Sequence, residues 1–266
     1  MEKPSTNDGI RIFREPRVFV IARQCISEEQ LERFLQEHGV AWQTDTEVAA
    51  ERIVETAGRV CYMSFARPRP GGNAAYIRHL LEAAHGSVLE HAVWSLLITQ
   101  VSRSLTHELV RHRAGWSYSQ LSQRYVDESV AEYVEPDVIA EDPELHALWL
   151  EGIKQAHDCY VRLAARLEAK FQGEPDRTMR RKLARQAARS VLPNATETKI
   201  FVTANARALR HFIEMRASRH AEVEIRKLAV KLLLVLQQEA PHLFGDYELV
   251  PLQDGTFEAV TRFRKV

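Results

Sequence analysis

The chain has 266 residues and 45% of them are hydrophobic, so it can bury a substantial core. Its 36 basic residues are balanced by 36 acidic ones, which leaves no overall field to attract nucleic acid or an anionic membrane. Since neither a secretory signal nor a long apolar run is present, the sequence predicts a cytoplasmic protein of one domain, 1–266, with a polar leader over 1–16.

The first half of the chain alternates short β-prone runs with amphipathic segments. A strand is predicted over Arg17–Arg23, and Ser27 with Gln30 forms a capping-box pattern that opens a helix over Glu28–His38. The Pro68–Gly72 breaker ends one connection. The other predicted elements are helices over Thr46–Val60, Asn73–Ala84 and Leu105–Val110 and a buried strand over Ala92–Val101.

The second half is mainly helical. Pro193 ends one of its helices because the residue before a proline resists the helical conformation. The last helix carries an apolar stripe at helical spacing, which indicates core or subunit interface. The predicted elements are helices over Pro143–Phe171, Asp176–Arg189, Ala206–Ala217 and Ser218–Glu239 and a strand over Thr196–Thr203.

The segment Arg111–Tyr125 (RHRAGWSYSQLSQRY) combines arginine, serine, glutamine and aromatic residues with almost no aliphatic side chain. Converging guanidinium groups neutralise a phosphate in fixed planar geometry, and serine and glutamine complete the oxygen contacts. A solvated, salt-bridged loop is the alternative. We interpret the segment as a binding site for an anion and a flat ring.

Several common chemistries are disfavoured. His107 and His112 are five residues apart, and not four as in a zinc-protease helix, so we predict no metal site. No glycine-rich phosphate loop is present, so side chains must hold any nucleotide. Cys61 and Cys159 have no neighbouring base that would activate a thiol, and we interpret them as core residues.

Polar clusters also stand at the ends of other predicted elements. Asn205 precedes a helix, and an N-cap role by itself would explain its position. Arg189, taken alone, is typical of a solvated charge. Arg216 and His220 are four apart and share one helical face. Together these clusters are best explained by convergence on a polyanionic ligand.

These residues resemble the signature of flavin-dependent thymidylate synthases, in which an RHR triplet precedes a serine and an Arg-Tyr pair. The triplet is Arg111-His112-Arg113, followed by Ser122 and Arg124-Tyr125. Flanking blocks HGSVLEH, QAARSVLP, NARALRHF and MRASRHAEVEIR extend the resemblance over residues 57–244. The chain departs from the pattern by one extra residue within Ala114–Leu121, which we expect to bulge the loop beside the flavin.

The resemblance implies methylation of dUMP to dTMP without an enzyme nucleophile. Methylenetetrahydrofolate would donate the carbon, and FAD reduced by NADPH would donate the hydride. Arg216 matches the arginine that activates the pyrimidine, and Arg124 and Arg189 match phosphate ligands. The full set implied for dUMP is Glu108, Arg111, Gln120, Leu121, Ser122, Gln123, Arg124, Arg189 and Arg216.

The resemblance also implies a flavin site assembled from several subunits of a homotetramer. The implied fold is α/β (α+β), with a mainly antiparallel sheet flanked by helices and long C-terminal helices. Neither nucleic acid nor membrane is an expected partner. The set implied for FAD is His85, Ser87, Arg111, His112, Arg113, Gln120, Asn205, Arg207, His211 and His220.

Two other functions stay open. One is a flavin- and folate-dependent pyrimidine nucleotide hydroxymethylase, which the inserted residue alone favours. The other is RNA binding by the basic helix over Asp176–Arg189, whose affinity would fall steeply with salt. Zero net charge and the lack of aromatic residues between its cations argue against RNA binding.

Overall fold

The computed structural model describes residues 5–7, 9–67, 69–130 and 132–264, so Pro68 of the predicted breaker lies outside the described residues. The chain forms two compact units. The first contains the residues up to Arg17, Ile98–Leu109 and Ser119–Ile200, and the second contains Val18–Leu97, Val110–Tyr118 and the residues from Phe201 onward. Both units are assembled from non-consecutive segments, and a single domain stays a prediction.

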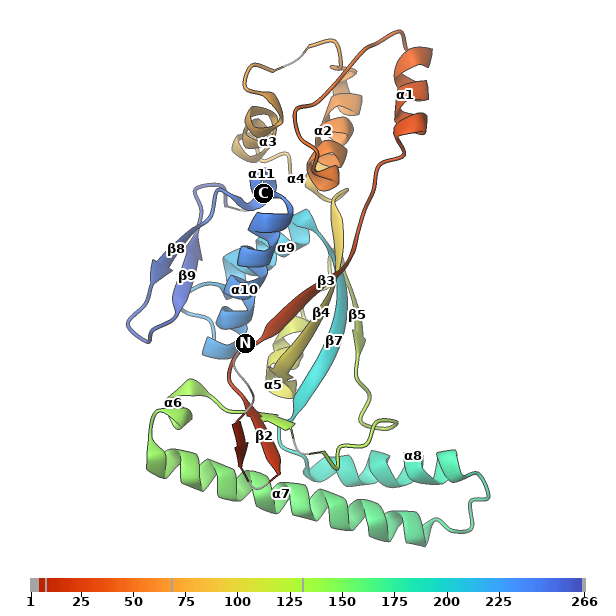
Figure 1. Ribbon diagram of the computed structural model, residues 1–266, viewed down its shortest axis with the longest axis vertical. Helices are drawn as coiled ribbons and strands as arrows, with labels where there is room; N and C mark the ends of the chain where they lie inside the picture. The colour runs from red at the N-terminus through yellow and green to blue at the C-terminus, as the bar shows by residue number, and fades with distance from the viewer. Residues whose placement is uncertain (1–4, 8, 68, 131, 265–266) are drawn as a thin grey trace. The chain divides into compact units, whose positions relative to one another are not determined.

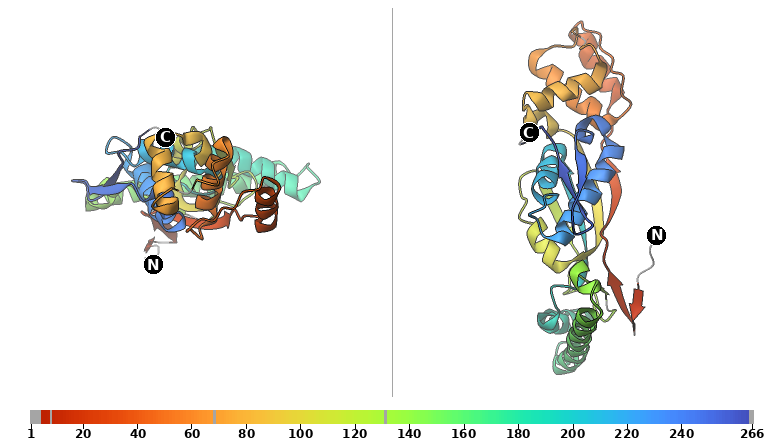
Figure 2. Two further views of the ribbon diagram at one scale, coloured as in Figure 1. Left: turned by 90° about the horizontal axis from the view of Figure 1, so that it is seen from above. Right: turned by 90° about the vertical axis from the view of Figure 1, so that its left-hand side faces the viewer.

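The first unit is built on two helices that lie side by side, α7 (Pro143–Lys170) and α8 (Arg177–Ala188) (Figures 1 and 2). Each begins at an aspartate whose carboxylate accepts backbone N–H groups of the first turn, Asp142 for α7 and Asp176 for α8. The unit also contains the short helices α5 (Arg103–Leu109) and α6 (Asp137–Ala140) and a 3₁₀ turn, Arg189–Val191.

The polar leader contributes two strands to the first unit. Strand β1 (Ser5–Asn7) pairs antiparallel with β2 (Ile10–Phe13), which pairs parallel with β6 (Glu132–Val134). The buried face of β2 packs with Tyr133 and two residues of α7. This core comprises Ile10, Ile12, Tyr133, Leu150 and Ile153.

A four-stranded sheet has the order β3-β4-β7-β5. Its strands are β3 (Arg17–Arg23), β4 (Val93–Ser102), β5 (Trp116–Gln120) and β7 (Glu197–Asn205). The prediction of a buried strand is confirmed in β4, where Trp94, Leu96 and Ile98 are buried and the residues between them are half-buried. Strand β5 was not predicted, because its residues are mostly polar.

The second unit packs helices with a C-terminal hairpin. The hairpin strands β8 (Glu248–Pro251) and β9 (Phe257–Val260) pair antiparallel, and β9 contacts α9 (Ala206–Arg216) and α10 (Val223–Glu239). Ile225, Leu228 and Leu232 of α10 are fully buried, so the apolar stripe is core. The helices are α1 (Glu28–Glu37), α2 (Ala49–Tyr62), α3 (Gly72–Glu82), α4 (Gly86–Leu89), α9 (Ala206–Arg216), α10 (Val223–Glu239) and α11 (Pro241–Phe244).

Three expectations about local structure are wrong. The side chain of Ser27 makes no capping hydrogen bond, so α1 begins without the predicted capping box. The last long helix begins at Val223 and not at Ser218, because the chain turns at Ser218–Ala221 and the Glu222 carboxylate then caps two N–H groups. The third concerns the thiols: Cys25, Cys61 and Cys159 are all exposed and none belongs to the core.

The α/β class with antiparallel pairing is confirmed by the β1-β2 and β8-β9 pairs, while β2-β6 is parallel. Among the helices of the described residues, none has both the length and the apolar character that a membrane span requires.

Candidate functional site

The Arg-rich segment is divided between the two units. Arg111–Tyr118 belongs to the second unit, and Ser119–Tyr125 belongs to the first. The residues implied for FAD lie almost entirely in the second unit, and most of those implied for dUMP lie in the first. Each unit therefore presents its own group of candidate residues.

In the second unit, Gly115 makes the turn after the RHR triplet possible. Its φ of 73° is in the left-handed region, and the N–H of Trp116 closes the turn on the carbonyl of Arg113. A Cβ at position 115 would lie 2.7 Å from the side-chain nitrogen of Asn205 and 2.8 Å from Ala208. The loop that carries Gly115 thus packs directly on the start of α9, and only glycine fits there.

The central contact of the second unit joins two predicted site residues. The Nε of Arg216, in the last turn of α9, donates a hydrogen bond of 3.0 Å to Nε2 of His112. The His112 ring lies 5.0 Å from the Phe212 ring, centroid to centroid, and 6.1 Å from the His211 ring. Its carbonyl accepts a 2.6 Å hydrogen bond from the Tyr118 hydroxyl. These contacts fix the guanidinium of Arg216 at a defined position beside the RHR loop.

The electrostatics make His112 an acceptor. Burial is the largest of three effects that together lower the pKa of His112 to about 4; the other two are the charge of Arg216 and the neighbouring His211. At neutral pH the ring is therefore uncharged, and Nε2 can accept from Arg216 while Nδ1 carries the hydrogen.

The lowered pKa gives a testable pH dependence. As the pH falls below about 6.5, the unfolded chain takes up a proton at His112 before the folded chain does, so the unfolding free energy is expected to decrease until about pH 4. Urea unfolding between pH 7 and pH 4 should show a shallower loss for His112→Gln than for the parent chain. The exposed His91, changed to Gln, serves as control. A His112 titration midpoint near 6.5 by NMR would contradict this assignment.

His85 and Ser87 line a common cavity of about 300 Å³ in the second unit. Its wall also contains Ser64, Arg69 and His79, which the sequence had not indicated as site residues. Hydroxyl, imidazole and guanidinium groups around one hollow are suited to a polar, anionic portion of a cofactor. Ser64 and Arg69 lie in the segment that connects α2 to α3, and His79 lies on α3; no sequence motif marks these three residues as site residues.

The remaining residues implied for FAD have different surroundings. Asn205 caps α9, because its Oδ1 accepts the N–H of Ala208 at 2.8 Å. Arg207 is exposed and donates to Glu90 at 2.6 Å, and Arg113 is exposed as well. Among the described residues, no hydrogen bond joins the exposed His220 ring to another predicted site residue.

In the first unit, the residues after β5 are held by short contacts. The Gln120 side-chain amide donates to Thr106 at 3.0 Å and to Thr198 at 3.3 Å. The Leu121 N–H donates to the carbonyl of Lys199, and the Ser122 hydroxyl accepts the N–H of Arg124 at 3.4 Å. Glu108 is half-buried on α5. After this turn, Gln123 is buried and Arg124 is half-buried.

Several buried polar atoms of the first unit lack a hydrogen-bond partner among the described residues. They are Arg103 Nη1, Gln123 Nε2, Arg124 Nε and Glu128 Oε1. A buried donor left unsatisfied costs on the order of 1–3 kcal/mol, so three such donors in neighbouring segments fit an anionic ligand. Two of the three belong to predicted dUMP residues.

Arg103 and Glu128 were not predicted as site residues. Burial lowers the pKa of Arg103; the charge of Glu128 opposes this effect, and that of Arg189 adds to it. Burial also raises the pKa of Glu128 to about 7. The structure therefore brings the predicted Arg189 within electrostatic range of a second guanidinium, that of Arg103, which no sequence motif marks.

Two basic side chains of α8 contact residues of the same unit. Arg185 donates to the carbonyl of Tyr125 at 2.6 Å and to Asp127 at 2.7 Å. Lys182 Nζ lies 4.9 Å from the centroid of the Tyr125 ring and, by hydrogen bonding, lowers the pKa of the Tyr125 phenol. These contacts anchor the end of the Arg-rich segment, and they account for cations that the RNA-binding alternative had used.

Metal chemistry gains no support from these groups. Within the parts of the chain that the structure describes, His, Cys, Asp and Glu side chains form no group of three that could hold a metal ion.

Comparison with known proteins identifies the family. The family described as thymidylate synthase complementing protein matches residues 44–242. The flavin-dependent thymidylate synthase of Mycolicibacterium vanbaalenii is 53% identical over 219 residues, which cover 82% of this chain and 87% of the relative. That of Corynebacterium efficiens is 51% identical over 226 residues, 84% of this chain and 90% of the relative.

Among solved structures, the chain is similar to the UMP/dUMP methylase PolB from Streptomyces cacaoi bound with 5-Br UMP. The TM-score is 0.63 at 22% identity, and the alignment covers 89% of this chain and 95% of PolB. At this identity the likeness concerns the fold alone. The sequence matches are much stronger, and they show that the chain is an enzyme that belongs to the thymidylate synthase complementing protein family.

Proposed function

We propose that this protein methylates dUMP to dTMP, with 5,10-methylenetetrahydrofolate as one-carbon donor and FAD, reduced by NADPH, as the source of the hydride. The names of the relatives support a flavin-dependent thymidylate synthase, and PolB is named as a UMP/dUMP methylase. The observation that carries the proposal is the hydrogen bond between Arg216 and His112. It lies beside the loop at Gly115, where the absence of a side chain allows the loop to pack against α9.

Arg216 is assigned the activation of the pyrimidine. A guanidinium held in place stabilises negative charge that develops on the uracil ring when the N3 proton is withdrawn, which makes C5 nucleophilic. The Nε of Arg216 donates to His112, and this hydrogen bond sets the orientation of the guanidinium plane. Because the His112 ring is neutral, it does not cancel the positive charge of Arg216. No thiol has a role in this chemistry.

The first unit is assigned the nucleotide phosphate. Arg124 and Arg189, with the Gln123 amide, would donate to the phosphate oxygens and satisfy buried donors that lack partners among the described residues. The second unit is assigned FAD, through the cavity of His85 and Ser87 and the segment around His112 and Asn205. The two sets would meet between subunits of a homotetramer in the cytoplasm.

The direct test is spectroscopic and chemical. The purified protein should take up FAD, show its oxidised absorption bands and lose them on addition of NADPH. With dUMP and methylenetetrahydrofolate it should then release a product with the mass of dTMP. A hydroxymethylated product, or activity on dCMP, would support the hydroxymethylase, and failure to bind FAD would overturn the proposal.

Arg124→Ala should weaken dUMP binding without loss of the flavin. Loss of one charge-assisted contact to the phosphate, about 1.5–3 kcal/mol, corresponds to a KM for dUMP raised roughly 10- to 100-fold. Steady-state kinetics and the FAD spectrum measure both properties. Arg177→Ala, at an exposed position of α8, is the control, and an unchanged KM for Arg124→Ala would remove the phosphate assignment.

A further inference from the structure

A second cavity in the second unit contains none of the candidate site residues. Its volume is about 690 Å³, and it is lined by one face of α3, by α11 and the turn after it, and by the hairpin and the residues that follow β9. The volume is within the range of small-molecule sites.

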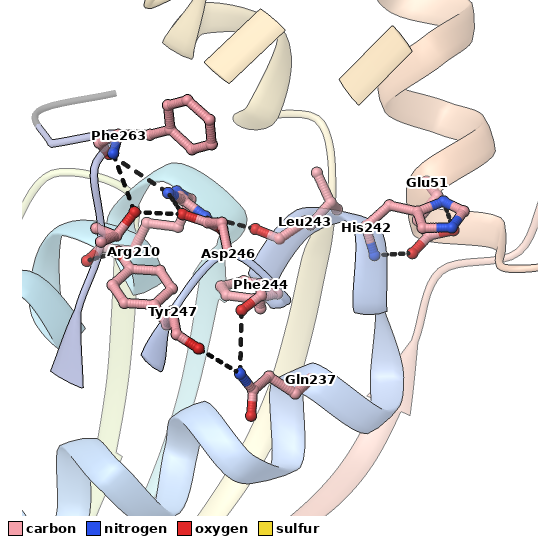
Figure 3. A network of polar contacts seen from close by, with 10 residues as sticks. Glu51, Arg210, Gln237, His242, Leu243, Phe244, Asp246, Tyr247 and Phe263 are labelled. Carbon is pink, nitrogen blue, oxygen red and sulfur yellow. Dashed lines mark hydrogen bonds and ion pairs between the residues drawn. The ribbon is translucent and has the colours of Figure 1, made fainter. Parts of the chain in front are cut away.

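Two residues that line this cavity, Asp246 and His242, belong to a network of buried polar contacts (Figure 3), which we call the floor. The Asp246 carboxylate receives both terminal nitrogens of Arg210, at 2.6 and 2.8 Å, and the Thr261 hydroxyl at 2.5 Å. Arg210 is 2% exposed and also donates to the carbonyl of Leu243 at 2.6 Å. A buried ion pair gives little net stability by itself, so a preformed polar floor under a hollow indicates recognition.

His242 completes the floor with a fixed orientation. Its Nδ1 lies 2.9 Å from Glu51 Oε2 and 2.7 Å from Asn73 Oδ1, and its backbone N–H donates to Glu51 at 2.7 Å. Glu51 and Asn73 are buried, which locks the ring. Since Nδ1 is engaged by the interior, Nε2 is the polar atom that this ring can present to the cavity.

The rim is cationic and partly aromatic. Arg78 makes no ion pair within the described residues, and Arg262 only approaches Glu82, at 3.9 Å, with both side chains exposed. Such an exposed pair holds the guanidinium weakly. The Asp246 carboxylate is compensated by Arg210, and Glu248 has no ion pair within the part of the chain that the structure describes. Two guanidinium groups and one such carboxylate therefore line the cavity.

We infer that this cavity binds a phosphorylated heterocycle of nucleotide size, separately from the proposed active site. Arg78 and Arg262 are suited to the phosphate oxygens. The Phe263 ring, which the Arg262 guanidinium approaches to 4.6 Å, offers a surface for a flat base, with Leu81 and Pro241 as further apolar lining. Thr261 and His242 supply hydrogen bonds to polar edges of the ligand.

The test uses the full-length FAD-saturated protein carrying Arg124→Ala, so that binding at the proposed active site is weakened. Calorimetry with dTTP and ATP should show one saturable site per chain. Arg78→Ala with Arg262→Ala should lower that affinity at least tenfold, whereas replacement of the exposed Arg33 and Arg166 by alanine should leave it unchanged. Absence of saturable binding, or binding that the double variant retains, overturns the inference.

A second variant separates the ring from the charge. Phe263→Ala should weaken dTTP and ATP but leave tripolyphosphate, the charge-only probe, unaffected; equal binding of nucleotides by Phe263→Ala and the parent would contradict a base-binding site. In the otherwise unsubstituted protein, the Arg78/Arg262 double variant should still bind FAD and form dTMP. Failure of this inference is therefore distinguishable from failure of the proposed function.

Discussion

Replacing Arg216 by lysine is expected to lower the rate of dTMP formation by about 100- to 1,000-fold while the protein still binds FAD. Lysine keeps the charge but loses the planar fork, and its ammonium cannot both donate to His112 Nε2 from the Nε position and face the pyrimidine. The effect should fall mainly on kcat, because the contact stabilises charge that develops during the reaction.

Single-turnover reoxidation of the flavin in the presence of dUMP and methylenetetrahydrofolate measures this step directly. Arg219→Lys is the matched control, since Arg219 is exposed and pairs with Glu258 close to the same helix end. Near-normal turnover of Arg216→Lys, with a normal flavin spectrum, would remove the activation role. Loss of flavin together with activity would assign Arg216 to cofactor binding.

The elements that the sequence predicted correctly are those in which apolar residues recur at regular helical or strand spacing. Helices α7, α8 and α9 and strands β4 and β7 begin and end within two residues of the predicted bounds, because apolar spacing, aspartate caps and Pro193 act locally. Strands such as β2 and β6 were missed, since each is short and is stabilised by a partner remote in sequence.

The sequence predicted which residues belong to the candidate site, but it did not predict how their side chains contact one another. Motif matching names Arg216 and His112, but nothing in their spacing shows that one donates to the other, because they are 104 residues apart. Arg103 and Glu128 carry no motif, and only burial reveals them as orphaned polar groups. The thiols were misjudged because cysteine is buried in most proteins, whereas here all three are exposed.

Arg210→Met is expected to lower the unfolding free energy of the protein by roughly 3–5 kcal/mol. Burial by itself would lower the pKa of Arg210, but the hydrogen bonds of Asp246, together with the charges of Tyr247, Asp246 and Glu214, raise it overall. The Arg210–Asp246 pair is thus held together in a nearly dry setting. Methionine would leave the Asp246 carboxylate without its counter-charge and the Leu243 carbonyl without its donor.

Urea unfolding of the FAD-free protein at pH 7 measures this loss, and a second substitution identifies its cause. If the uncompensated carboxylate is responsible, Arg210→Met with Asp246→Leu should recover part of the stability, because the double change removes both charges together. The exposed ion pair Arg33–Glu37 on α1 provides the control, since Arg33→Met should change stability by less than about 0.5 kcal/mol. Equal losses for the single and double variants would place the effect in packing around Arg210, including the Tyr247 ring 4.8 Å from its guanidinium carbon, and not in the buried charge.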